Sequence, residues 1–169
     1  ATNGKDLSLA MSNDQQLRQA TPHVQSGPYA HEMRAGDEYA PLSFVVTPEI
    51  NQQFLYALDD FHPDYVAPGE AAFVHPVVLL HMSARTRSPS FHMAPRMGSV
   101  FAKDIVTFRA PAQVGDTLHV RWRIKDVYEK RGRLYQALST RIRGERSGDA
   151  LEREAHSVFF VGSPGAGGS

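Results

Sequence analysis

The chain of 169 residues contains no cysteine, which excludes disulfide bonds, thiolate metal ligands and a cysteine nucleophile. It also lacks an excess of charge, because 18 basic and 18 acidic side chains give a formal net charge of zero. A chain without a global field has no general attraction to nucleic acid or to an anionic membrane. We therefore expect neither of them to be a partner.

Long apolar segments are missing too. The most apolar run, VVLL at 77–80, is far too short to span a bilayer. The first residues lack the basic and apolar regions of a secretory signal. These absences, with that of cysteine, predict a cytoplasmic protein that does not enter a membrane.

The chain has eight histidines, but no pair shows the close spacing of known metal-ligand motifs. We therefore expect no metal and no cofactor.

The two ends differ in composition from the middle of the chain. Residues 1–30 are polar and aperiodic, and predict an N-terminal arm. Residues 162–169 are rich in glycine and serine, and predict a flexible tail. Between these ends lies neither a repeat nor a linker, so residues 31–161 are expected to form a single domain.

The first half of this domain has helical patterns. SFVV at 43–46 predicts a short strand. Thr47 and Pro48 suit the start of a helix, whose apolar face would be Ile50, Phe54 and Leu58. This helix is predicted to run into the sequence DDFHPDYV, where prolines end it.

A second helix is predicted within residues 71–86, starting near Pro76. Its first turns are apolar on all sides, which is typical of a buried helix. His81 on this helix is interpreted as a core residue.

The second half predicts four long strands, at 99–110, 117–128, 133–145 and 150–161. In the second of them apolar and polar residues alternate, as in a half-buried strand. Short turns join the last three strands into a meander. The predicted fold class is α+β, with an antiparallel sheet wrapped around one buried helix.

Four motifs within residues 34–161 carry a resemblance to a known family: RAGDEYAPLSFVVTPEINQQF, DDFHPDYV, FVHPVVLL and VTFRAPAQVGDTLHVRWRI. In their order and spacing they resemble the MaoC-like acyl-thioester hydratase/dehydratase family of the hot-dog fold. The resemblance implies a dimer, with sheets joined edge to edge. It also implies an acyl thioester of coenzyme A or a carrier protein as substrate. Water would add to an α,β-unsaturated thioester, or leave a 3-hydroxyacyl one.

The motif DDFHPDYV departs from the family's hydratase motif at its catalytic position. Asp60 takes the place of the family's aspartate and Pro63 that of its proline, but His62 stands where asparagine is expected. Tyr65 stands where the resemblance implies the catalytic histidine. Tyrosine has a reference pKa of about 10, so it is a poor base at neutral pH.

The motif FVHPVVLL departs as well. His75 matches the family's histidine, whereas Pro76 replaces a glycine whose N–H would face the thioester oxygen. Proline has no N–H. The amide of Val77 could take over, because a helix start presents free donors.

Two interpretations follow. In the first, the site is rebuilt: Asp60 activates water, His62 or His75 moves the proton, and Tyr65 orients substrate or water. Pro76 and Val77 would then face the thioester, and Arg85 and Arg87 could bind coenzyme A phosphates, for which arginine is well suited.

In the second interpretation, hydration is lost. The chain is then a non-catalytic acyl-binding subunit of a heteromer, or a hot-dog enzyme of different chemistry, such as a thioesterase. Each of these residues could also have a purely structural role.

Overall fold

The computed structural model describes residues 27–68 and 71–162. Five strands form one antiparallel sheet in the order β1-β3-β4-β5-β2. The strands are β1 (Leu42–Val45), β2 (Met97–Phe108), β3 (Thr117–Lys130), β4 (Arg133–Gly144) and β5 (Gly148–Val161). The helices are α2 (Pro48–Leu58), α3 (Pro63–Val66) and α4 (Pro76–Met82), with 3-10 turns at Ala30–Glu32 and Arg85–Arg87.

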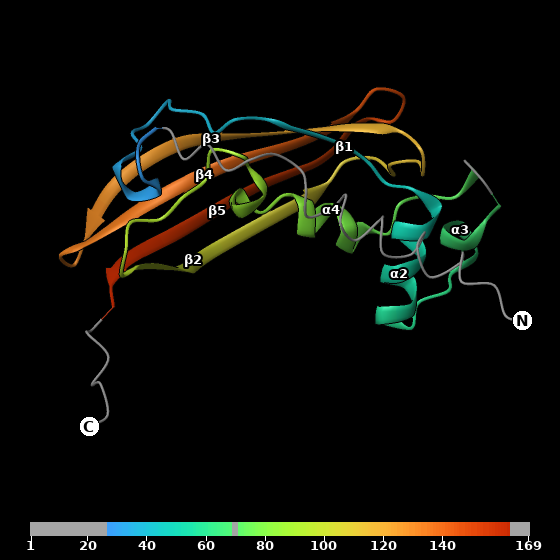
Figure 1. Ribbon diagram of the computed structural model, residues 1–169, viewed down its shortest axis with the longest axis horizontal. Helices are drawn as coiled ribbons and strands as arrows, with labels where there is room; N and C mark the ends of the chain where they lie inside the picture. The colour runs from blue at the N-terminus through green and yellow to red at the C-terminus, as the bar shows by residue number, and fades with distance from the viewer. Residues whose placement is uncertain (1–26, 69–70, 163–169) are drawn as a thin grey trace, which may run out of the picture.

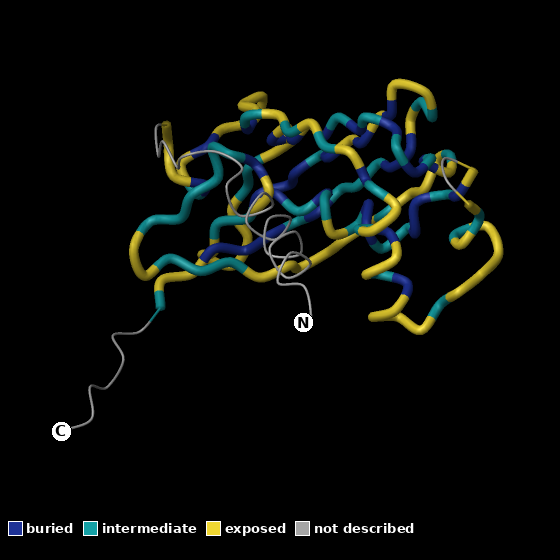
Figure 2. The backbone as a smooth tube through the Cα atoms, turned by 45° about the vertical axis from the view of Figure 1, so that its right-hand side comes forward, coloured by how far each residue is buried: buried dark blue, intermediate teal, exposed yellow. Residues whose placement is uncertain are grey.

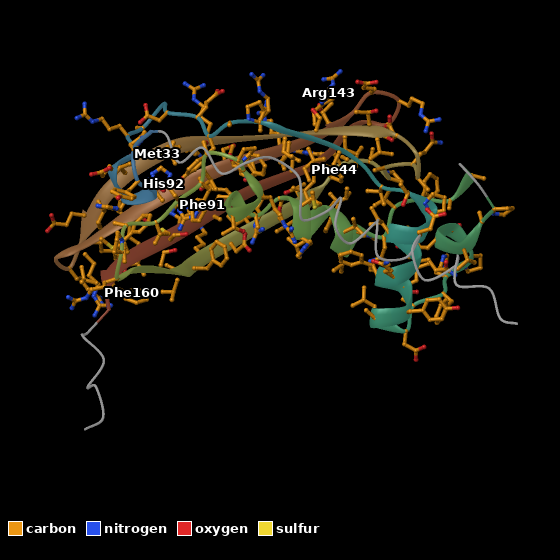
Figure 3. All side chains as sticks on the ribbon, viewed as in Figure 1. Met33, Phe44, Phe91, His92, Arg143 and Phe160 are labelled. Atoms are coloured by element: carbon orange, nitrogen blue, oxygen red, sulfur yellow. The ribbon has the colours of Figure 1, made fainter. Side chains whose placement is uncertain are left out.

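The four long strands and the meander β3-β4-β5 are confirmed. Leu118, Val120, Trp122 and Ile124 alternate along β3, and each is at most 1% exposed. Their polar neighbours lie on the opposite face, and Arg143 likewise points away from α4 (Figure 3). The period of two thus decides which face of the sheet is buried.

The core lies between the sheet and α4, which lies on one face of the sheet (Figure 1). The buried segments gather in the interior of the fold (Figure 2). Val78 and Leu79 are each 2% exposed. Beyond the helix, Trp122 Nε1 donates a hydrogen bond of 2.8 Å to the carbonyl oxygen of Ser83. Apolar packing and this bond hold the helix against β3.

The start of α2 is as predicted, because the Thr47 hydroxyl accepts a hydrogen bond of 3.3 Å from the amide of Ile50. The predicted end of this helix was wrong, and its predicted apolar face holds for Ile50 and Phe54, which pack against the core, but not for Leu58. The helix ends at Leu58, where Asp59 adopts a left-handed conformation with φ 52°, and Pro63 begins α3 instead of ending α2. The helix also buries Asn51 and Leu55, whereas Leu58 is 44% exposed.

The second predicted helix starts at Pro76, as expected, but ends at Met82, before the end of the predicted range. Before it, the amide of Val74 donates a backbone hydrogen bond to the carbonyl oxygen of Ala112. The interpretation of His81 as a core residue was wrong, since His81 is exposed in the chain. The tight end at Met82 leaves only two turns for the buried face.

The predicted arm and tail fall mostly outside the described residues: residues 1–26 of the arm and 163–169 of the tail. At the inner end of the arm, Ala30 is fully buried and its amide donates to the carbonyl oxygen of His92. Among the described residues, no helix combines the length and apolar character that crossing a bilayer requires.

Asp116, in the link between β2 and β3, fastens the β4–β5 turn. Its side chain is 1% exposed and accepts hydrogen bonds from the Ser147 hydroxyl at 2.7 Å and the Ser147 amide at 2.9 Å. Burial alone would raise the pKa of Asp116, but the hydrogen bonds from Ser147 and Arg146 outweigh it and lower the pKa. The carboxylate is therefore stabilising when ionised.

We predict that Asp116→Asn lowers the free energy of unfolding by about 2 kcal/mol at neutral pH, because an amide cannot accept this set of bonds. Urea denaturation measures the change. Because the folded-state pKa is lowered, the difference from the wild type should disappear as the pH falls through it. Asp149→Asn is the matched control, since Asp149, at the start of β5 just after this turn, forms an exposed ion pair of 3.5 Å with Arg143. Equal losses in the two variants would contradict this role.

Candidate active site

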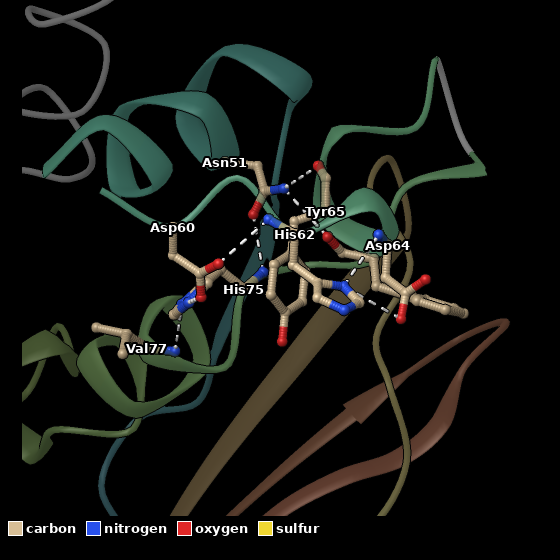
Figure 4. A network of polar contacts seen from close by, with 8 residues as sticks. Asn51, Asp60, His62, Asp64, Tyr65, His75 and Val77 are labelled. Carbon is tan, nitrogen blue, oxygen red and sulfur yellow. Dashed lines mark hydrogen bonds and ion pairs between the residues drawn. The ribbon is translucent and has the colours of Figure 1, made fainter. Parts of the chain in front are cut away.

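Asp60 and His75 meet where the end of α2 approaches the start of α4 (Figure 4). Asp60 follows the left-handed turn at Asp59, and its amide donates to the carbonyl oxygen of Leu55 at 3.1 Å. Its Oδ2 lies 3.1 Å from His75 Nε2. The imidazole is 10% exposed and the carboxylate 45%. The imidazole of His75 is thus largely buried, whereas the carboxylate of Asp60 faces solvent.

The neighbours of His75 determine its tautomer. The amide of Val77 donates to His75 Nδ1 at 3.2 Å, so this nitrogen carries no proton. The proton of the neutral ring is therefore on Nε2, which donates to Asp60. This hydrogen bond, and a second one from the His62 amide at 3.2 Å, lower the pKa of Asp60. Asp60 is consequently ionised at neutral pH.

Asn51 on α2 holds the site together, and sequence reasoning missed it. It is 2% exposed, and its Oδ1 accepts a hydrogen bond of 2.8 Å from the His75 amide. Its Nδ2 donates to the carbonyl oxygens of Tyr65 at 3.3 Å and Phe73 at 3.1 Å. The available signal was its spacing of four from Leu55, which puts a polar residue on the buried face of α2.

Tyr65 lies beside the Asp60–His75 pair. The centroid of its ring is 4.8 Å from that of His75. No hydrogen-bond partner of its hydroxyl is found within the described ranges 27–68 and 71–162. The hydroxyl is thus available to a ligand.

His62 contributes its backbone to the site, not its side chain. The side chain is 59% exposed, and its Nδ1 accepts a hydrogen bond of 3.3 Å from the Asp64 amide at the start of α3. Only the His62 amide contacts Asp60. The geometry therefore favours His75 over His62 as the partner of the carboxylate.

The Val77 amide, which was expected to face the thioester oxygen, already has a hydrogen-bond partner within the chain. That partner is His75 Nδ1, and the next amide, of Val78, donates to the His75 carbonyl oxygen at 2.9 Å. Pro76 has no N–H to offer. The start of α4 therefore presents no free donor to a thioester oxygen, because the histidine that precedes the helix caps it.

The two arginines after α4 differ. Arg85 is 6% exposed; it donates to Gln136 Oε1 at 3.1 Å and to Ser99 Oγ at 2.7 Å, and lies over the ring of Phe159. It therefore anchors its segment to the sheet, and its contact with phosphate stays a prediction that its buried position does not favour. Arg87 is exposed, and its contact with phosphate stays a prediction.

Within the part of the chain that the structure describes, no three histidine, aspartate or glutamate side chains gather in a group that could hold a metal ion. What the site offers is an ionised carboxylate, a histidine of fixed tautomer and a free phenol. This combination is suited to proton transfer to and from water.

The fold and this site define a hot-dog protein of the hydratase/dehydratase class. Residues 33–149, more than half of the chain, match the family described as FAS1-like, dehydratase domain region. The chain belongs to this family. The predicted resemblance to hydratases and dehydratases is thereby confirmed. The comparison with curated proteins gave no match.

Solved structures confirm the hot-dog fold. A MaoC-like dehydratase from Rhodospirillum rubrum has a TM-score of 0.60 at 17% identity, over 82% of this chain and 99% of that one. The (R)-hydratase from A. caviae, involved in PHA biosynthesis, has a TM-score of 0.58 at 20% identity, over 76% and 98%. The HadBC complex, a 3R-hydroxyacyl-ACP dehydratase from Mycobacterium tuberculosis, has a TM-score of 0.58 at 18% identity, over 77% and 99%.

Proposed function

We propose that this chain is a hydro-lyase that adds water to an α,β-unsaturated acyl thioester, or removes it from a 3-hydroxyacyl thioester. The observation that carries the proposal is the Asp60–His75 hydrogen bond of 3.1 Å, which leaves an ionised carboxylate facing solvent. The dehydratase family of residues 33–149 supports the same class of reaction.

Asp60 is the base of the proposed reaction. In hydration its carboxylate takes one proton of a water molecule while the water oxygen bonds to the β-carbon of the thioester. The electron pair of the double bond moves toward the thioester carbonyl. The carboxyl group then returns the proton to the α-carbon, so that the net change is the addition of one water. His75 Nε2–H orients Asp60 throughout.

Tyr65 supplies the donor that α4 does not. Negative charge develops on the thioester oxygen in the transition state and requires a hydrogen bond. The Tyr65 hydroxyl is unoccupied within the described residues and lies next to His75, whereas the amides of Val77 and Val78 are already bonded. Tyr65 therefore takes the role first expected of Val77.

The substrate is proposed to be a thioester of coenzyme A or of an acyl carrier protein, and the assembly a dimer through the free edge of β2. This edge strand exposes apolar side chains to a partner: Val100, Phe101, Ile105 and Phe108, each between 45% and 58% exposed. The similar HadBC structure is a complex, so a related chain is as suitable a partner as a second copy.

A second candidate is a non-catalytic acyl-binding subunit of such a heteromer. The observation that favours it is the start of α4, whose amides are all satisfied within the chain. A third, the thioesterase, needs Asp60 to activate water toward the thioester carbon instead of the β-carbon.

An assay of the purified chain with crotonyl-CoA separates these candidates. We expect loss of the enoyl-thioester absorbance, formation of 3-hydroxybutyryl-CoA and no free thiol. Release of free coenzyme A thiol at the rate at which the enoyl-thioester absorbance is lost would indicate a thioesterase. Binding of crotonyl-CoA without either product, for the chain alone, would contradict the hydro-lyase and leave the binding subunit.

A further inference from the structure

Tyr65, whose ring packs against that of His75, lines two hollows. One, of about 280 Å³, lies beside the start of α4 and is lined by Phe73, Pro76, Leu79 and Phe108. The other, of about 330 Å³, lies between α2 and α3 and is lined by Leu55, Phe61, Val66 and Val114. Tyr65 lines both. We call them the α4 hollow and the α2 hollow.

The Tyr65 ring is held in place from several sides. Its carbonyl oxygen accepts a hydrogen bond from Asn51, and its amide donates to the His62 carbonyl oxygen at 2.9 Å. Its ring packs against those of His75 and, at 5.8 Å between centroids, His62. These contacts fix the position of the Tyr65 ring. Figure 4 shows the ring between the two histidines.

The two hollows differ in their relation to the reacting groups. Pro76, which precedes the Val77 amide, lines the α4 hollow. Of the residues that the structure describes, the α2 hollow shares only Tyr65 with it, and it is lined by the buried side chains of Leu55 and Val114. Because Tyr65 is the one described lining residue that the two hollows share, an acyl chain in the α4 hollow would have to displace its ring to reach the α2 hollow.

We propose that Tyr65 determines the acyl-chain length that this protein accepts, by closing the α4 hollow so that short acyl groups are preferred. The inference rests on the proposed function for the identity of the ligand as an acyl thioester. Its physical basis is apolar burial: each methylene removed from water improves affinity about fourfold. Methylenes that cannot pass Tyr65 bring no such gain.

The test measures binding, not turnover. Dissociation constants of saturated acyl-CoA thioesters with four, six, eight and ten carbons are determined by calorimetry, because these ligands cannot be hydrated. For the wild type we expect affinity to stop rising within this series. In Tyr65→Ala the rise should continue, so that the affinity ratio of the ten-carbon to the four-carbon ligand increases at least tenfold.

Two further variants make the result specific. Tyr65→Phe keeps the ring and should keep the wild-type profile, although it loses the hydroxyl needed for catalysis. Tyr65→Ala with Val66→Trp refills the α2 hollow from an exposed position and should restore the short-chain profile. Tyr65→Leu replaces Tyr65→Ala if the latter does not fold.

An unchanged length profile in Tyr65→Ala, or no binding of any acyl-CoA, would overturn the inference. A shift in Tyr65→Phe equal to that in Tyr65→Ala would overturn it as well. A wild type that binds short thioesters but hydrates none contradicts the proposed function alone. Hydration by the wild type with no change of profile in Tyr65→Ala contradicts this inference alone.

Discussion

Asp60→Asn is expected to lower kcat for hydration of crotonyl-CoA at least about 100-fold, the usual range for loss of a general base. The amide oxygen of asparagine can still accept the hydrogen bond from His75 Nε2, so the arrangement of the two residues is kept. What is lost is the charge and basicity of the carboxylate. Because Asp60 is partly exposed, the melting temperature should change little.

The adjacent carboxylate provides a matched control. Asp59 is exposed and left-handed, a conformation that asparagine adopts readily, so Asp59→Asn should retain the activity of the wild type. The lowered pKa of Asp60 also predicts that the acid limb of the kcat/KM profile, which reports the free enzyme, lies below the ordinary range of a carboxyl group. An Asp60→Asn variant with more than about a tenth of the activity would exclude Asp60 as the general base.

Asn51→Leu is expected to lower the free energy of unfolding by about 3 kcal/mol and to impair activity as well. Leucine has a similar volume but leaves the His75 amide and the carbonyl oxygens of Tyr65 and Phe73 without their partner. Each buried backbone group that loses its hydrogen bond costs about 1–3 kcal/mol. The expected total lies at the low end for three groups, because water can reach some of them after local movement. Once His75 and Tyr65 are released, the proposed base Asp60, which His75 orients, and the proposed donor Tyr65 lose their relative positions, and kcat falls.

Thermal unfolding and the crotonyl-CoA assay measure these two effects. For a domain of this size, 3 kcal/mol corresponds to a fall of about 6–12 °C in melting temperature. Gln52→Leu is the control, because it places the same side chain at an exposed position of the same helix. It should change stability by less than about 0.5 kcal/mol. A melting temperature of Asn51→Leu equal to that of Gln52→Leu would show that the three hydrogen bonds are dispensable.

Local patterns predicted much of the fold. The alternation around Trp122 identified both the strand and its buried face, because a strand repeats every two residues whatever its neighbours are. Thr47 identified the start of α2, since a capping hydroxyl needs only the amides of the next turn. The end of that helix was not predictable in this way. Asp59 ends α2 in a left-handed conformation, and Pro63 starts α3 only a few residues later, so the local sequence allows more than one end point.

By itself the sequence made Asp60, Tyr65 and His75 candidates for the site, and its resemblance to the family indicated that Tyr65 stands where a histidine is expected. The tertiary structure alone decided their state. His75 caps α4 and so removes the Val77 donor, Arg85 turns into the core, and Asn51 fixes the backbone from α2. These outcomes depend on contacts between segments distant along the chain, whose burial forces each polar group to find a partner. Local sequence does not encode which partner that is.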